Sequence, residues 1–154
     1  MSITIYRSVG AGAPSNKRMI RMGELVLETI RERDIDVSIQ VVGEAKMRRL
    51  NRAHRGKDHA TDVLAFAMRD GERMDASDWG DVFLCPAVIR RQAKEHGVAF
   101  EEEFVRTLIH GMLHLAGYDH ERRAAAKRMF RLQERILGQT VRKVQGSRAF
   151  INHV

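Results

Sequence analysis

The chain has a single cysteine, Cys85, among its 154 residues. An internal disulfide and a cysteine-based zinc cluster are therefore excluded, because both need more than one thiol. A metal site in this chain would have to be built from histidine and carboxylate side chains, and the sequence has 7 histidines. Cys85 follows an apolar run, so we expect it to be a small core side chain.

Long apolar runs are also missing. The most apolar stretches, Val63–Met68 and Val82–Ile89, are far shorter than the roughly 20 residues that a membrane helix needs. The first residues contain no basic segment followed by an apolar core, so the sequence indicates no secretory signal. We therefore expect a cytoplasmic protein that does not span a membrane.

Acidic residues are outnumbered: 27 Lys and Arg face 20 Asp and Glu, which gives a net charge of +7. A polyanion such as nucleic acid is a plausible partner, although solubility alone would also explain this charge. Basic residues cluster in Arg48–Lys57 and again in Arg122–Arg131. Aromatic residues make up only 6% of the chain. If only Phe100 and Phe104 are considered near the later cluster, aromatic residues are too few there, and we expect no platform on which the bases of single-stranded nucleic acid would stack.

Hydrophobic periodicity predicts about four strands and about five helices, which indicates an α+β or an α/β protein. Of the two we expect α+β, with one mixed sheet covered by the helices. Two short, uniformly apolar runs are typical of central strands that are covered on both faces: Val63–Ala67 and Val82–Leu84. We expect one domain over residues 1–154, in which 138–154 forms a basic C-terminal tail. The expected strands are Ile3–Tyr6, Val37–Val41, Val63–Ala67 and Val82–Leu84, and the expected helices are Lys17–Arg33, Glu44–Arg52, Pro86–His96, Phe100–Leu115 and Glu121–Leu137.

Three histidines carry the chemistry. His110 and His114 are four residues apart, so on a helix they lie on one face and are close enough to share an ion. Gly117 permits the positive φ that ends a helix, which would turn the chain so that His120 supplies a third imidazole. Three imidazoles leave one tetrahedral position open, which is typical of catalytic zinc. Nickel, copper or iron would accept imidazoles as well.

The spacing of these ligands also matches that of metzincin proteases, H-E-x-x-H-x-x-G-x-x-H. One position differs: Gly111 stands where the general-base glutamate of a protease would be. Metal-dependent hydrolysis of a peptide or small amide is therefore a weaker hypothesis than metal binding itself. The remaining histidines have no such spacing, and we expect them on the surface or in loops: His54, His59, His96 and His153.

A second polar segment, Leu50–Phe66, packs charges and a glycine directly before an apolar run. Its Arg55 could hold a phosphate through a two-pronged hydrogen bond and neutralise charge that builds on the phosphate oxygens. A solvated loop would explain Arg55 and Lys57 equally well, and a cap or ion pair would explain Asp62.

With both segments considered together, the sequence closely resembles the YbeY family of metal-dependent endoribonucleases, which are ribosomal RNA maturation factors. His110–His120 matches that family's H-G-x-L-H-L-x-G-Y-D-H, and Arg55–Asp58 with Thr61–Leu64 and Phe66 matches a second motif. The resemblance spans roughly Leu50 to Leu137. Three features depart from it. Ala65 and Ala67 stand where the family usually has Ser and Pro, the stretch after His120 is basic where relatives are often acidic, and the tail after Leu137 has no counterpart.

The resemblance implies one Zn²⁺ per chain held by His110, His114 and His120, with Arg55 taking part in cleavage. It also implies action on ribosomal RNA, at the 3′ end of the small-subunit RNA and in ribosome quality control, together with ribosome-associated proteins. No general base is identified, although Asp62 or Glu103 could reach the site. Asp119 could orient a metal ligand, and it would equally well cap the helix that starts near Glu121. The alternative of another class is a non-catalytic ribosome assembly factor whose metal organises the fold.

Overall fold

The computed structural model describes residues 2–9, 12–33, 35–67, 78–118 and 122–148. It contains four strands and five helices in these ranges, as the sequence predicts for an α+β fold. In chain order they are β1 (Ser2–Arg7), α1 (Asn16–Thr29), β2 (Asp36–Val41), α2 (Glu44–Arg55), β3 (Val63–Ala67), β4 (Asp78–Leu84), α3 (Pro86–His96), α4 (Phe100–Leu115) and α5 (Arg123–Arg148).

The strands form one mixed sheet in the order β1-β2-β4-β3. β1, β2 and β4 are parallel, and β3 pairs with β4 in the antiparallel direction. β3 is therefore an edge strand, and its expected central position is wrong. The register pairs Val63 with Leu84 and Ala65 with Val82, so the start of β3 lies beside the end of β4.

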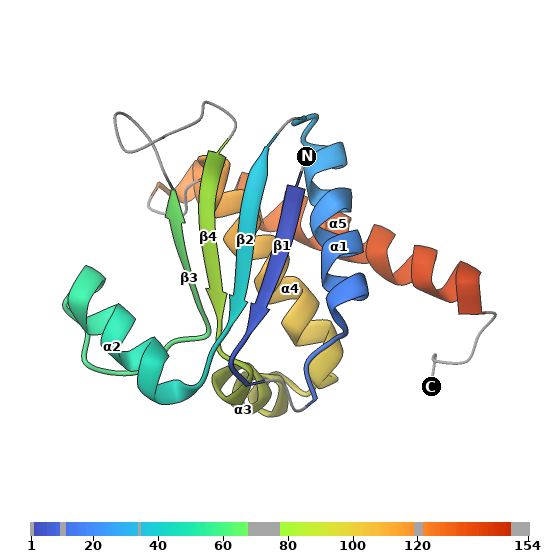
Figure 1. Ribbon diagram of the computed structural model, residues 1–154. Coiled ribbons are helices and arrows are strands. Elements are labelled where there is room, and N and C mark those ends of the chain that lie inside the picture. Colours follow the sequence, from blue (N-terminus) through green and yellow to red (C-terminus); the bar gives the residue numbers. More distant parts are fainter. Residues whose placement is uncertain (1, 10–11, 34, 68–77, 119–121, 149–154) are drawn as a thin grey trace.

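Helices α1, α4 and α5 lie together on one face of the sheet (Figure 1). The main core fills the space between this helical layer and the sheet, and α4 is the most buried helix, with ten buried residues. On the other face, Leu64 and Phe83 pack with Met47 of α2 and Val88 of α3 in a smaller cluster. Burial of successive β4 residues, Val82 and Phe83, confirms the expected coverage of that strand on both faces.

Helix α4 approaches the sheet closely at Gly111. A Cβ atom at this position would lie 2.8 Å from Val82 Cγ1 and 2.9 Å from Val63 Cγ2, which is closer than side chains pack. Because position 111 faces two β-branched residues, neither an alanine nor a glutamate fits there without displacing the helix. The absence of a protease-like glutamate thus has a packing cause.

Four other element boundaries differ from the prediction by three residues or more. α1 ends at Thr29 rather than Arg33, and α2 continues to Arg55 rather than ending at Arg52. α5 continues through Gly138 to Arg148, so the expected helix end at Leu137 is wrong. β4 begins at Asp78, four residues before the predicted start. Within the described ranges, no helix combines the length and apolar content that crossing a membrane would require.

Candidate metal centre

His110 and His114 lie on one face of α4, as their spacing predicts. Their rings are nearly parallel, with an interplanar angle of 8° and 6.4 Å between ring centroids. This separation reflects one turn of helix, over which side chains four residues apart are neighbours. The two strongest ligand candidates of the sequence are therefore brought together.

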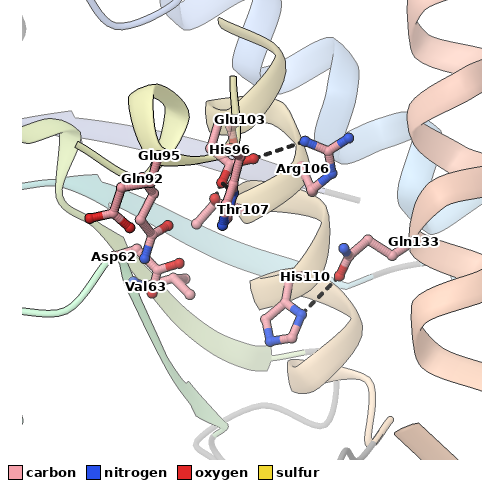
Figure 2. Close-up of a pocket in the computed structure, with 10 residues that line it drawn as sticks. All are labelled: Asp62, Val63, Gln92, Glu95, His96, Glu103, Arg106, Thr107, His110 and Gln133. Carbon is pink, nitrogen blue, oxygen red and sulfur yellow. Dashed lines mark hydrogen bonds and ion pairs between the residues drawn. The ribbon is translucent and has the colours of Figure 1, made fainter. Parts of the chain in front are cut away.

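The ring of His110 is oriented by Gln133 of α5. The two groups meet through His110 Nδ1 and Gln133 Oε1 at 2.8 Å (Figure 2). An amide oxygen only accepts hydrogen bonds, so Nδ1 is the donor, and in the neutral ring the lone pair is on Nε2. Metal-binding histidines are commonly fixed in this way, with one ring nitrogen bonded to an acceptor and the other directed to the ion.

The ring of His114 is oriented by the turn that ends α4. Gly117 has φ +99°, and the N–H of Tyr118 donates to the carbonyl of Leu113 while the N–H of Gly117 donates to that of His114. This hydrogen-bond pattern is a Schellman motif, so the predicted helix end at Gly117 is confirmed. The same turn brings the Tyr118 carbonyl to 3.1 Å from His114 Nδ1, which gives His114 the tautomer found for His110.

The third expected ligand, His120, lies outside the described residues, as does Asp119. Within the described ranges, no three His, Cys, Asp or Glu side chains come together as a metal site. The described part of the site thus consists of two imidazoles on one helix face, each with its lone pair on Nε2. That donor chemistry fits a zinc ion bound by histidine nitrogens.

Polar contacts continue from Gln133 into the space between α4 and α5. Gln133 Nε2 donates to Glu134 Oε2 at 3.1 Å, and Arg106 of α4 donates to both Glu134 oxygens at 3.0 and 3.2 Å. Burial alone would raise the pKa of Glu134, but hydrogen bonds from Arg106 and Gln133 outweigh it and hold that pKa below its usual value. The Glu134 carboxylate in turn raises the pKa of Arg106. This charged pair fixes which end of the Gln133 amide faces His110.

Glu103 extends the same network on the other side of Arg106. Its side chain is almost fully buried and accepts hydrogen bonds from Arg106 Nη1 and His96 Nδ1, both at 2.8 Å. Two hydrogen bonds of this kind hold a buried carboxylate in place. Glu103 is therefore bound within an ion-pair network. His96, expected in a surface or loop role, takes part in this network at the end of α3.

A cavity of about 330 Å³ lies beside His110. Figure 2 shows Asp62 and Val63 at the start of β3 on one side of it, and His110 and Gln133 on the other. Asp62 Oδ1 accepts hydrogen bonds from the N–H of Val63 and from Thr61. Two carboxylates that the sequence suggested could approach the site, Asp62 and Glu103, thus line the cavity. The cavity is lined by Asp62, Val63, Gln92, Glu95, His96, Glu103, Arg106, Thr107, His110 and Gln133.

Arg55 is not among the residues that line this cavity. It is the last residue of α2 and is exposed, and Gly56 ends the helix with φ +69°. The loop after this helix is anchored by buried Asn51, whose Nδ2 donates to the carbonyl of His59 at 2.8 Å. Asp58 is paired with Arg48, and the hydrogen bond from Arg48 lowers the pKa of Asp58.

Sequence reasoning missed Gln133 and Arg106. The available signal was a polar residue at a buried helical position: Gln133 shares a face of α5 with buried Met129 and Ile136. Such a residue needs a partner, because burying an unbonded amide costs about 1–3 kcal/mol. Nothing in the spacing indicated that the partner would be His110.

Comparisons with known proteins identify relatives of this chain. A family model described as Endoribonuclease YbeY matches residues 15–141. A protein named Endoribonuclease YbeY from Aromatoleum aromaticum is 38% identical over 141 residues, which cover 89% of this chain and 86% of that protein. One of the same name from Lactobacillus helveticus is 42% identical over 118 residues, covering 70% of this chain and 68% of that protein. The solution structure of TM1509 from Thermotoga maritima is similar in fold, with a TM-score of 0.66, 30% identity, and coverage of 94% of this chain and 93% of that one.

Proposed function

Because the chain belongs to the endoribonuclease YbeY family, we propose that it hydrolyses phosphodiester bonds of single-stranded ribosomal RNA with the help of one zinc ion per chain. The observation that supports the metal is the pair of imidazoles whose Nδ1 atoms both face oxygen acceptors. His110, His114 and His120 would hold the ion. When bound, zinc would polarise a phosphate oxygen or lower the pKa of a water molecule.

Asp62 is the best candidate to orient and deprotonate the attacking water. It lines the cavity beside His110, and both hydrogen bonds that it accepts from the described part of the chain go to Oδ1. Glu103 is a poorer candidate, because each of its oxygens already accepts a hydrogen bond from a side chain. Asp62 would therefore serve as the general base, and Glu103 would keep Arg106 in place.

Arg55 would hold the phosphate. Its exposed position at the end of α2 suits a residue that meets the substrate from solution rather than one that completes the cavity. A guanidinium donates two parallel hydrogen bonds to a phosphate and stabilises the charge that develops on its oxygens during cleavage.

The biological role follows from the family. We propose that the substrate is precursor or defective ribosomal RNA, including the 3′ end of the small-subunit RNA, and that the reaction takes place in the cytoplasm among ribosome-associated proteins. Peptide hydrolysis is disfavoured by a specific observation. Position 111 packs against Val63 and Val82, so the helix has no room for the glutamate that a zinc protease uses.

The test is cleavage of ribosomal RNA by the purified, zinc-loaded protein. His114→Ala should lose both bound metal and cleavage, and Arg55→Ala should keep the metal while kcat falls by about 10²–10³, the usual loss when one transition-state hydrogen-bond donor is removed. Arg49→Ala is the matched control, because Arg49 is an exposed arginine of the same helix.

Full activity in both His114→Ala and Arg55→Ala would refute the proposal. The assembly-factor alternative predicts a different result: removing the metal would unfold the protein, and the intact protein would show no nuclease activity of its own. A panel of peptide substrates would test the remaining hypothesis, metal-dependent hydrolysis of a peptide or small amide.

A further inference from the structure

The outward side of α5 carries a continuous row of basic residues, which we call the basic stripe. All of its members are exposed: Arg123, Lys127, Arg128, Arg131 and Arg135. At 3.6 residues per turn and 1.5 Å per residue, they occupy an arc of about 140° around the helix and about 18 Å along it. This is long enough to follow several consecutive phosphates of an extended strand.

No described part of the chain neutralises the basic stripe. The only carboxylate between residues 122 and 148 is Glu134, and it is engaged by Arg106. No ion pair among the described residues involves a member of the stripe. Its positive charge is thus directed to solvent, where it favours a polyanionic partner.

A single aromatic side chain of α5, Phe130, flanks the basic stripe, about 20° outside its arc. It is 60% exposed, more than any other phenylalanine of the described chain. Phe130 precedes Gln133 by three residues, which places it about 4.5 Å away along the axis and about 60° away around it. Gln133 holds His110, so the exposed ring stands between the candidate metal centre and the basic stripe.

We propose that single-stranded RNA lies along α5, with its phosphates against the basic stripe and one base stacked on Phe130. This inference rests on the proposed function and names the surface that delivers the substrate. An aromatic platform beside a row of cations is the combination that binds single strands, because a free base has a face to stack and its backbone carries the charge.

Other partners fit this surface less well. The bases of a duplex are already stacked on each other, so Phe130 would gain nothing from one. A membrane-surface helix needs a broad apolar face next to its basic face, whereas the exposed side of α5 between 122 and 140 offers only Phe130 as a large apolar residue.

The test is binding of a fluorescein-labelled 12-nucleotide single-stranded RNA to the zinc-loaded protein, followed by fluorescence anisotropy, with a gel to verify that the RNA stays intact. Phe130→Ala should weaken binding about five- to hundred-fold, and Phe130→Trp should restore it. A 2-aminopurine base in the RNA should be quenched by the wild type and by Phe130→Trp, and not by Phe130→Ala. A duplex of the same sequence should bind all three proteins alike.

The charge is tested with Lys127→Ala/Arg131→Ala. The slope of log K against log salt should become shallower by about 1.4, since each lost phosphate contact of a single strand contributes about 0.7. Lys17→Ala/Arg21→Ala is the matched control, because this exposed pair on α1 has the same residue types and spacing. Thermal unfolding should be unchanged in every variant.

The inference is wrong if Phe130→Ala binds the RNA as tightly as the wild type, if both double variants change the salt slope equally, or if vesicles with 30% phosphatidylserine bind better than RNA. Its failure is distinguishable from that of the proposed function. Cleavage that does not depend on Phe130 would refute the surface alone, and tight Phe130-dependent binding without any cleavage would refute the nuclease alone.

Discussion

Replacing Gln133 with leucine isolates the contribution of the residue behind His110. Leucine has nearly the size of glutamine, and the Gln133 side chain is only 7% exposed, so the substitution keeps the packing between α4 and α5. What is lost is the acceptor at 2.8 Å from His110 Nδ1. The imidazole can then rotate, and the tautomer with its proton on Nε2 is no longer disfavoured.

The expected consequence is weaker metal binding. Loss of a hydrogen-bond partner behind a metal-binding histidine typically lowers affinity about 10- to 100-fold, which corresponds to about 1.4–2.7 kcal/mol. The cost of leaving one buried polar group without its partner, about 1–3 kcal/mol, gives the same range independently. Competition with a chromophoric zinc chelator measures this difference directly, and metal analysis of the wild type should give about one ion per chain.

Two variants make the result specific. Gln139→Leu changes another glutamine of the same helix that is not fully buried, and it should leave zinc affinity unchanged. Gln133→Glu keeps an acceptor for His110 but loses the donor to Glu134, so it should retain zinc while becoming less stable. If Gln133→Leu binds zinc as tightly as the wild type, or loses no more than Gln139→Leu, then Gln133 does not orient a metal ligand.

Three further predictions concern the elements around the site. Gly111→Ala should lower stability by about 1–3 kcal/mol in denaturant unfolding, because its Cβ would overlap Val63 and Val82, and an unchanged midpoint would contradict the close approach of α4 to the sheet. Gly117→Ala should cost about 1 kcal/mol at φ +99° and also weaken zinc binding, since the turn carries the carbonyl that faces His114; chelator competition and thermal unfolding check both effects. Glu134→Gln should remove about 1–2 kcal/mol at neutral pH, discounted because both partners are partly exposed. The pKa of Glu134 is depressed in the folded state, so its contribution is present above the unfolded pKa and is lost as pH falls through the folded pKa. Unfolding free energy measured from neutral to acidic pH should therefore fall less steeply in Glu134→Gln, and parallel curves would exclude this role.

Much of the fold follows from local patterns in the sequence. The alternation in Val37–Val41 and the apolar face of Phe100–Leu115 predict β2 and α4 correctly. When one face of a strand or helix is buried, apolar residues recur in the sequence at the period of that element. The position of β3 could not be predicted this way. Val63–Ala67 is uniformly apolar although it lies at the sheet edge, since α4 covers one of its faces and the smaller core cluster holds Leu64 on the other.

The two glycines near the helix ends show the limit of local signals. Gly117 ends α4 with a positive φ, whereas α5 passes through Gly138 as regular helix. The residues around Gly138 account for the difference, because Leu137 and Thr140 are both buried and continuing the helix keeps them in the packed interior. A glycine permits a helix to end, and packing of the next residues decides whether it does.

The candidate site, too, could be predicted only in part: the sequence indicates the residues that local spacing brings together, and not those that helix packing brings together. The pair His110 and His114 follows from helical spacing alone, so the sequence predicts it directly. Its orientation by Gln133 depends on how α5 packs on α4, which no spacing encodes. The expectation of no stacking platform overlooked Phe130, which lies within the basic cluster Arg122–Arg131. Its exposure, in contrast, depends on which side of α5 meets the core, which the sequence does not state.

The His pair is positioned by contacts on opposite sides of one helix. On the sheet side, Gly111 sets how close α4 lies to Val63 and Val82, and with the same packing it excludes a carboxylate from the helix position next to His110. On the α5 side, Gln133 sets the orientation of the ring. Glu103 of α4 also lines the cavity, but His96 and Arg106 already engage its carboxylate. The proposed general base is therefore Asp62, which stands at the start of β3, directly before Val63. The close approach of α4 to β3 thus brings His110, one of the proposed metal ligands, and Asp62, the proposed base, to the same cavity.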